Sequence, residues 1–489
     1  MKKILILLIM FIWLMCFGLP NPVIFAKDDS DLLKDLDVEL KKGSEEESLL
    51  TELDTELKPK KEEKVFLETL IDNLSGDLRL RWQRFWYRPD DREGLDKKFN
   101  VEEIRLKFSS FYNAGDLRLD LSGWIEAGNQ DDTYAGVGKF YRDRHRERRY
   151  VELNEFYFTY SKGNCDLTLG KKLFKVGIST LYSPTDRHSP REGNDPIDFK
   201  DLGIWQGRVD YYIKDISFTF AVLPIFQTNK SPSSHSRWTS SVIEKDEQTD
   251  SDFYTLEADK ENTEIKDHYP GVKLRNISYY ARIKGTWHGW DWFLSTYQGL
   301  NPYYVLKKIK KGGKTYYIKK NVFIAEYAGG FSTSYKSWEF HGEVLYNHSY
   351  NKKDDDYFNY VGGITYTIDE WLQRLHLKKL IIIVEYAGEI PVHGQKARYY
   401  EKSSRECRAG RNDIYSLFRL EATDDLIFKY KSNFELSKGG RANIFISEYR
   451  LKPRVKWRTS FEFFNGGKKS YYGRWRKNDR MVMELIYSF

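Results

Sequence analysis

Segments in which apolar and polar residues alternate recur along this chain from Gly76 to its last residue. The first clear example is residues 77–83, which read DLRLRWQ, and the pattern returns at 103–108, 338–346 and 455–463. Because successive side chains of a β-strand point to opposite faces, such segments predict strands with one apolar face and one polar face. The stretch 76–489 is therefore expected to be all-β.

The composition narrows the environment in which these strands can pack. Charged residues make up 31% of the chain and the mean hydropathy is −0.65. After residue 26, no run is apolar enough to predict a membrane-spanning helix. Aromatic residues nevertheless reach 16%, which is too many for a disordered chain. The net charge of +7 gives no strong indication of nucleic-acid binding. A water-lined β-barrel in an outer membrane fits all of these values.

The lengths of the connections between predicted strands support a barrel over a soluble β-sandwich or propeller. Short connections alternate with long ones, as expected when one end of a barrel carries tight turns and the other carries extended loops. The expected short connections include 112–116, 161–165, 214–215, 288–289 and 336–337, and the expected long ones include 127–149, 177–202, 226–270, 299–320 and 390–412. The count predicts a transmembrane antiparallel β-barrel of about 18 strands, a monomeric pore with short periplasmic turns and long extracellular loops.

The two ends of the chain agree with this interpretation. The last ten residues, RMVMELIYSF, alternate and end on the aromatic Phe489, as the final strand of many outer-membrane barrels does. Residues 1–26 have the charged start, apolar middle and small final residue of a signal peptide. Residues 27–75 are dense in charge and predict a periplasmic linker that is partly helical, and 76–489 is the expected barrel. Cys165 and Cys407 are expected at opposite ends of it and unpaired.

The polar faces of the predicted strands should line the lumen, where their chemistry sets selectivity. Acidic side chains alternate with basic ones there, so a neutralised network that packs the barrel remains one interpretation. The other is a basic lining that attracts anions, because a guanidinium group can bind a carboxylate through two hydrogen bonds. The candidate substrate-binding residues are Arg79, Arg81, Arg105, Lys107, Arg208, Arg282, Lys284, Arg419 and Arg458. Tyr212, Tyr280, Tyr297 and Tyr415 fall on the same faces and are candidates for stacking on sugar rings.

One stretch of sequence resembles a known family. Residues 150–177, followed by a long polar loop and then the strand that contains Gly207-Arg208, are similar to the alginate export porins, with Glu155-Phe156 and residues 169–172 (LGKK) as the matching pieces. The resemblance implies an outer-membrane barrel with an electropositive pore that passes a polyuronate to the outside. Glu152 departs from the family, which tends to carry arginine in that strand, and an inward carboxylate there is expected to repel a polyanion.

These observations predict a porin or export channel for a saccharide, an anionic polysaccharide such as alginate, working by passive diffusion or coupled to a secretion machinery. The expected partners are an anionic or neutral saccharide, outer-membrane lipid and lipopolysaccharide, and periplasmic secretion components. We expect the outer membrane as location, with the N-terminal segment in the periplasm. No nucleic acid, cofactor, metal or catalytic residue is expected.

Three alternatives remain open. The first is a general or oligosaccharide-uptake porin. The second is a barrel enzyme of the phospholipase or protease type, for which His341, between Glu339 and Glu343, is the candidate, although a structural histidine is expected. The third is an adhesion or structural barrel whose lysine-rich tract 307–321 binds lipopolysaccharide or another anionic polymer.

Overall fold

The computed structural model describes residues 61–89, 95–130, 134–135, 148–230, 232, 235–239, 247–249, 255–257, 263–467 and 470–489. The chain divides into two compact units, Met1–Asp72 and Asn73–Phe489. In the first unit the described residues form helix α4 (Lys61–Asp72). The expected signal peptide 1–26 and most of the expected linker lie outside the described residues. None of the helices in the described part of the chain is long and apolar enough to cross a membrane.

The second unit is built around a single sheet of 18 strands. In chain order these are β1 (Ser75–Phe85), β2 (Asn100–Ala114), β3 (Leu117–Gly128), β6 (Val151–Lys162), β7 (Cys165–Lys172), β10 (Ile204–Ile213), β11 (Ile216–Leu223), β15 (Ser278–Trp287), β16 (Trp290–Leu300), β19 (Phe323–Tyr335), β20 (Trp338–Ser349), β21 (Asp356–Ile368), β22 (Lys379–His393), β24 (Asn412–Glu421), β25 (Leu426–Glu435), β26 (Arg441–Lys452), β27 (Val455–Asn465) and β28 (Arg480–Ser488).

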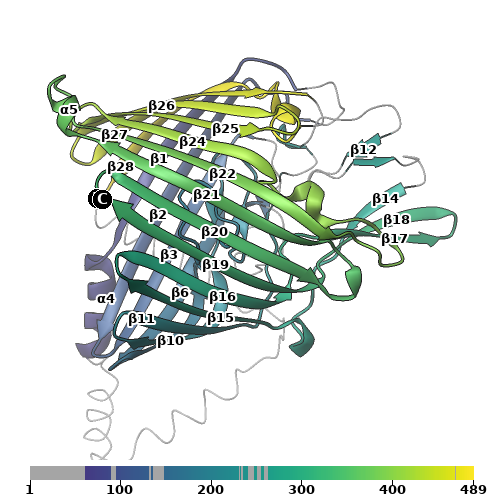
Figure 1. Cartoon of the computed structure of the whole chain (residues 1–489). Helices are drawn as coiled ribbons and strands as arrows, with labels where there is room; N and C mark the ends of the chain where they lie inside the picture. Colours follow the sequence, from purple (N-terminus) through teal and green to yellow (C-terminus); the bar gives the residue numbers. More distant parts are fainter. Residues whose placement is uncertain are drawn as a thin grey trace, which may run out of the picture. The chain divides into compact units, whose positions relative to one another are not determined.

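Each strand pairs antiparallel with its neighbours in the chain, and the sheet closes because β28 pairs with β1, from Asp77↔Ser488 to Phe85↔Arg480. Figure 1 shows the tilted strands of this closed barrel. Closure leaves no free sheet edge, so every strand satisfies its backbone hydrogen bonds within the wall. The prediction of an antiparallel barrel of about 18 strands is confirmed.

Short connections gather at one end of the barrel and long ones at the other (Figure 1). Several short ones are two-residue turns whose first residue has a positive φ, as at Gly115 (58°) and Lys336 (53°). Turns of this hand match the twist of the strands they join, and glycine adopts them without steric cost. The turn at 369–378 is longer and contains helix α5 (Glu370–Gln373).

The largest difference from the expected strand boundaries is at the start of β15; β7 and β22 end within four residues of the expected positions. The strand expected after the long connection 226–270 begins only at Ser278 (β15), because Pro270 interrupts the pairing and residues Leu274–Asn276 form the short 3-10 helix η2. Proline has no N–H to give to a sheet, so the ladder resumes only after this helix.

Small sheets stand among the long connections. Strands β14 (Thr263–Asp267), β17 (Val305–Lys311), β18 (Lys314–Lys320) and β23 (Tyr400–Lys402) form a four-stranded sheet outside the wall. Two-stranded sheets join β4 (Tyr134–Ala135) to β5 (Arg148–Arg149), β8 (Arg191–Glu192) to β9 (Lys200–Asp201), and β12 (Glu247–Thr249) to β13 (Thr255–Glu257).

The two faces of the wall differ as the alternation predicts. On β11, for example, Phe218 and Phe220 are exposed on the outer face, whereas Ser217, Thr219 and Ala221 are buried on the inner one. The connection between β7 and β10, residues 173–203, is held by inward-pointing side chains from many strands, so it runs inside the barrel. We call this segment the lumen loop.

Candidate functional site

The lumen loop is fastened to the β1–β2–β28 side of the wall by two aspartates. Asp198 Oδ2 lies 3.0 Å from Arg79, 3.1 Å from Arg81 and 3.5 Å from Arg105. Asp195 accepts two hydrogen bonds from Arg480, at 2.8 and 3.0 Å. Ionic hydrogen bonds of this two-pronged kind fix both distance and orientation.

Wall glutamates complete the neutralisation of the same arginines. Glu103 lies 2.6 Å from Arg79 and 2.7 Å from Arg148, and Glu126 lies 2.8 Å from both Arg105 and Arg148. These side chains are almost fully enclosed, and buried charges persist only when they are paired in this way. The alternation places Arg79, Arg81 and Arg105 on the inner face correctly, but the loop and the glutamates cover them, so they present no open surface to a solute.

Two further glutamates fasten the other half of the lumen loop through its backbone. Glu343 Oε1, on β20, accepts hydrogen bonds from the N–H groups of Ile178 and Ser179, both at 2.6 Å. Glu385, on β22, accepts from the three N–H groups of residues 180–182, at 2.8–2.9 Å. Five consecutive backbone donors are thus satisfied by two wall carboxylates, which compensates the loop for having no sheet partner.

Apolar and aromatic contacts support the loop between these anchors. Phe174 packs edge-on against Tyr280 of β15, with ring centroids 4.7 Å apart, and His188 stacks on Tyr297 of β16 at 4.2 Å. Arg187 forms an ion pair with Glu326 of β19, and His188 Nε2 lies 3.2 Å from the same carboxylate. Of the tyrosines expected to stack on sugars, Tyr280, Tyr297 and Tyr415 are buried in such packing and only Tyr212 is exposed.

Glu152 does not act as the sequence suggested. Its carboxylate lies 2.6 Å from Lys230, 3.0 Å from Lys171 and 3.2 Å from Arg149. Because three cations surround it and only 1% of the residue is exposed, Glu152 presents no net negative charge to the lumen. The expected repulsion of a polyanion at this position is therefore wrong.

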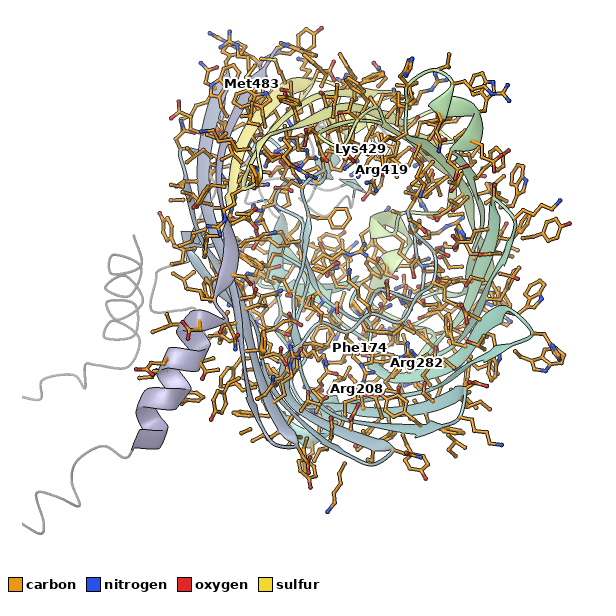
Figure 2. The ribbon with its side chains drawn as sticks, turned by 90° about the vertical axis from the view of Figure 1, so that its left-hand side faces the viewer. Phe174, Arg208, Arg282, Arg419, Lys429 and Met483 are labelled. Atoms are coloured by element: carbon orange, nitrogen blue, oxygen red, sulfur yellow. The ribbon has the colours of Figure 1, made fainter. Side chains whose placement is uncertain are left out.

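Basic side chains that the loop does not cover lie on two sides of the barrel interior. Figure 2 shows Arg208 and Arg282 near Phe174 on one side and Arg419 and Lys429 together on the other. Arg208 is paired with Asp210 on its own strand at 2.6 Å, and Thr219 donates to the same carboxylate. We call these two sides the β10–β15 lining and the β24–β27 lining.

On the β10–β15 lining, Arg282 and Lys284 carry uncompensated charge. They follow each other on the inner face of β15, opposite Ser295 and Phe293 of β16 and Thr219 and Ser217 of β11. Among the described residues, no acidic side chain forms an ion pair with either of them. Their neighbours are hydroxyls or apolar groups, so both cations act on whatever occupies the lumen.

On the β24–β27 lining, two cations sit directly across from each other. Arg419 and Lys429 are register partners on β24 and β25. Each forms an ion pair with a carboxylate: Arg419 lies 2.8 Å from Glu421, and Lys429 lies 2.9 Å from Glu448. Like charges directly opposite on neighbouring strands destabilise a sheet, and these two carboxylates offset that repulsion.

Arg458 and Lys431 extend the β24–β27 lining, and Lys107 lies apart from both linings. Arg458 lies 3.0 Å from Glu484 and 3.8 Å from Glu448. Lys431, the next inward position after Lys429 on β25, has no acidic ion-pair partner in the described part of the chain. Lys107 is exposed on the inner face of β2, opposite Asp77 and Trp124.

His341 is a buried wall residue. Its Nε2 lies 3.0 Å from Glu385, the anchor of the lumen loop, and its Nδ1 lies 4.0 Å from Glu339. Within the described residues no serine or threonine hydroxyl is hydrogen-bonded to the ring. His341 thus holds Glu385 in the orientation in which it accepts hydrogen bonds from the loop backbone. This role is structural.

Several residues that build this site were not singled out from the sequence. Arg480 and Glu484 occupy inward positions of the last strand, so the alternation that identified the strand could have found them. Asp195, Asp198 and Lys200 lie in the lumen loop, where no periodicity indicates which wall residue each will meet. Cys165 and Cys407 are both free thiols, as predicted.

No protein-family model matches the sequence, and no curated protein matches it. Among solved structures, this chain is similar to OccK11 (OpdR) of Pseudomonas aeruginosa, with 10% identity over 85% of this chain and 95% of that one and a TM-score of 0.44. It is similar also to a triple mutant of the Rhodopseudomonas blastica porin, with 10% identity over 85% and 99% and a TM-score of 0.38. A third match is OmpT, an outer membrane protein of Vibrio cholerae, with 9% identity over 85% and 96% and a TM-score of 0.36.

None of these three is described as an alginate export porin, so the resemblance to that family stays a hypothesis. Their TM-scores are below 0.5, and the barrel architecture of this chain accordingly rests on its own strand pairing.

Proposed function

We propose that this protein is an outer-membrane channel whose lumen favours anionic solutes, with an anionic saccharide such as a polyuronate as the solute class. The outer face of the barrel supports the membrane location. Large apolar side chains are exposed there on strand after strand, for instance Phe218, Leu294, Tyr327, Val344 and Phe445. A contiguous apolar band around a closed barrel is stable in lipid and unfavourable in water.

The observation that carries the anion preference is a set of three inward cations, Arg282 and Lys284 on β15 and Lys431 on β25, that form no ion pair with an acidic side chain among the described residues. Their charge adds to that of Arg419 and Lys429, which are paired with Glu421 and Glu448, and gives a positive potential where the lumen loop leaves the wall uncovered. Guanidinium and ammonium groups together suit carboxylates. Sugar stacking is a weaker part of the proposal, because three of the four candidate tyrosines are buried.

In this proposal the short turns and both ends of the barrel chain face the periplasm and the long loops face outside. Transport is diffusion or is coupled to a periplasmic machinery, and the protein catalyses no reaction. An oligosaccharide-uptake porin would share this geometry but would show no charge preference. The barrel enzyme is not favoured, because the ion-pair partners of His341 among the described residues are the carboxylates of Glu339 and Glu385.

Reversal potentials in planar bilayers under a KCl gradient test the proposal. We expect anion selectivity and stronger block by oligouronates than by neutral oligosaccharides of equal length. The double variant Arg282→Ala/Lys431→Ala should lose most of the selectivity, whereas Lys452→Ala, an exposed lysine at the end of β26, should keep it. Cation selectivity in the unmodified protein, or no channel at all, would refute the proposal.

A further inference from the structure

A lysine-rich hairpin stands outside the barrel wall. Strands β17 and β18 form it, with β14 and β23 on its flanks, and Figure 1 shows β14, β17 and β18 beyond the strand ends at the long-loop side. Several of its lysines have acidic partners. Lys308 lies 3.0 Å from Glu401, Lys319 3.5 Å from Asp267, and Lys314 3.6 Å from Glu264.

Four other cations gather at the base of this hairpin, and none of them forms an ion pair with an acidic side chain among the described residues. Lys320 faces Val305 across the hairpin, which places it diagonal to Lys307 on the same face of the sheet. Diagonal neighbours on one face are about 7–8 Å apart at Cβ, within reach of long side chains. Lys353 and Arg275, from two other connections, lie near enough for their charges to act on Lys320. We call these four residues the rim cluster.

The electrostatics confirm that the rim cluster is a concentration of like charge. Burial, followed by the nearby charges of Lys307, Lys353 and Arg275, lowers the pKa of Lys320 below its ordinary value of 10.5. Within the described part of the chain, no acidic side chain forms an ion pair with any of the four. Holding cations together without an anion costs free energy, and a bound anion would recover it.

The neighbouring aspartates do not supply that anion. Asp354 accepts from the N–H and hydroxyl of Ser404 and from Asn301, and only 1% of it is exposed. Asp355 accepts from the backbone of Gln395, and Asp356 from the backbone of Ser349. All three carboxylates following Lys353 are thus turned away and occupied.

The position of the rim cluster relative to the strand ends indicates how far from the membrane core a bound ligand would lie. Arg275 precedes β15 by three residues and Lys320 precedes β19 by three. Lys353 lies in the connection between β20 and β21, residues 350–355. The cations therefore sit just beyond the ends of neighbouring strands, where the apolar outer band gives way to the headgroup layer.

We propose that the rim cluster binds the phosphate groups of an anionic glycolipid, lipopolysaccharide, in the surrounding outer leaflet. Lysine ammonium groups bind phosphate as mobile point charges, and basic pockets at the headgroup level hold anionic lipid headgroups. This inference rests on the membrane location in the proposed function, but it is independent of what the lumen conducts.

The test uses the full chain in detergent micelles, with binding of lipopolysaccharide compared with binding of the same material after enzymatic removal of its phosphates. We expect the triple variant Lys307→Ala/Lys320→Ala/Lys353→Ala to bind intact lipopolysaccharide about 100-fold more weakly, since each cation near an anionic lipid surface contributes a factor of about five. Dephosphorylated material should bind the unmodified protein about as weakly.

A matched control removes the same charge from the tip of the hairpin. Lys310→Ala/Lys311→Ala/Lys314→Ala should reduce binding by no more than about threefold, because these side chains are exposed and screened. An equal loss in both triple variants would show diffuse attraction and overturn the proposal. Competition by oligouronates, but not by inorganic phosphate, would assign the cluster to a solute in transit and overturn it as well.

Channel recordings on the same variants keep the two proposals separate. Unchanged conductance and selectivity in the rim-cluster variant would show that the barrel is folded, so that its loss of lipopolysaccharide binding reports on the site. A protein that binds phosphorylated lipopolysaccharide but forms no anion-selective channel would refute the proposed function alone.

Discussion

Tyr182 of the lumen loop stacks on Tyr415 of β24, with ring centroids 5.3 Å apart and planes only 2° from parallel. The same tyrosine donates its backbone N–H to Glu385 of β22 at 2.8 Å and its hydroxyl to Asn359 of β21 at 3.0 Å. One loop residue is thereby fixed to three wall strands, so the loop tip is a rigid part of the pore lining.

This attachment predicts the effect of removing Glu385. In Glu385→Ala the N–H groups of residues 180–182 lose their acceptor, and an unpaired buried donor costs about 1–3 kcal/mol. The loop tip should leave the wall intermittently, so single-channel currents should become noisier with additional conductance levels. Glu339→Ala, a lumen glutamate on β20 with no contact to the loop, removes the same charge and should leave the current steady. Equal noise in both variants would contradict the anchoring role.

Arg480 is expected to be the most costly arginine to remove. It is fully enclosed and bonded to Asp195 of the loop and Glu462 of β27. Removing one partner of a buried ionic pair costs about 3–5 kcal/mol because the other charge stays buried. Urea unfolding of Arg480→Ala should show this loss. Arg118→Ala breaks a half-exposed pair with Asp120, which is worth about 0–1 kcal/mol. If the two variants unfold at the same urea concentration, the ion pairs of Arg480 do not stabilise the barrel.

The β24–β27 lining predicts opposite effects for two neighbouring residues. Arg419→Ala should lower anion selectivity, and Glu421→Ala should raise it, because the ion pair between them is then left with one charge. Reversal potentials measure both. The difference between the two variants should be clear in 0.1 M salt and nearly vanish in 1 M, where the screening length falls from about 10 to 3 Å. A shift of the same sign in both variants would show that the lining does not set selectivity.

The alternation of side chains made the wall predictable from the sequence. Residues 77–83 assign Arg79 and Arg81 to the inner face and Leu80 and Trp82 to the outer one, as the structure has them. The same rule, applied to each segment, gives the strand count and the end at which long connections gather. These features depend on neighbours along the chain or across one turn.

What the alternation could not predict is whether an inner face is open. Arg79 and Asp198 are 119 residues apart, and nothing local to either indicates that they meet. The lumen loop has no repeat, and the backbone donors of residues 178–182 are satisfied by glutamates 164–205 residues distant. The prediction for Glu152 was wrong for the same reason, since two of the three cations around it come from other segments of the chain. Accessibility of a lumen charge is a tertiary property.

The carboxyl of Asp479, in a long connection outside the wall, titrates at a pH that depends on how deeply it is buried. Asp479, in the connection before β28, accepts a hydrogen bond from the N–H of Phe464 at 2.7 Å. Burial raises the pKa of its carboxyl to about 6 from an ordinary value of 3.8, against the smaller opposing effect of that hydrogen bond. The folded protein therefore holds this proton more tightly than the unfolded chain does.

The sign of the pH dependence follows from that difference. A raised folded-state pKa gives a stabilising contribution that is complete below about pH 4 and is lost as the pH rises through 6. In Asp479→Asn the side chain stays neutral and can still accept from Phe464. Relative to the unmodified protein, the variant should therefore gain stability between pH 4 and 7 and show a constant difference above pH 7, measured as urea midpoints in detergent micelles.

Asp424 provides a control of opposite sign. This exposed residue is paired with Lys378, and that hydrogen bond lowers the pKa of its carboxyl. Relative to the unmodified protein, Asp424→Asn should lose a little stability as the pH rises toward 4, where the carboxyl of the unfolded chain ionises, and show a constant difference above about pH 5. A difference curve for Asp479→Asn that is flat from pH 4 to 8, or that falls with rising pH, would show that Asp479 is hydrated in the folded barrel.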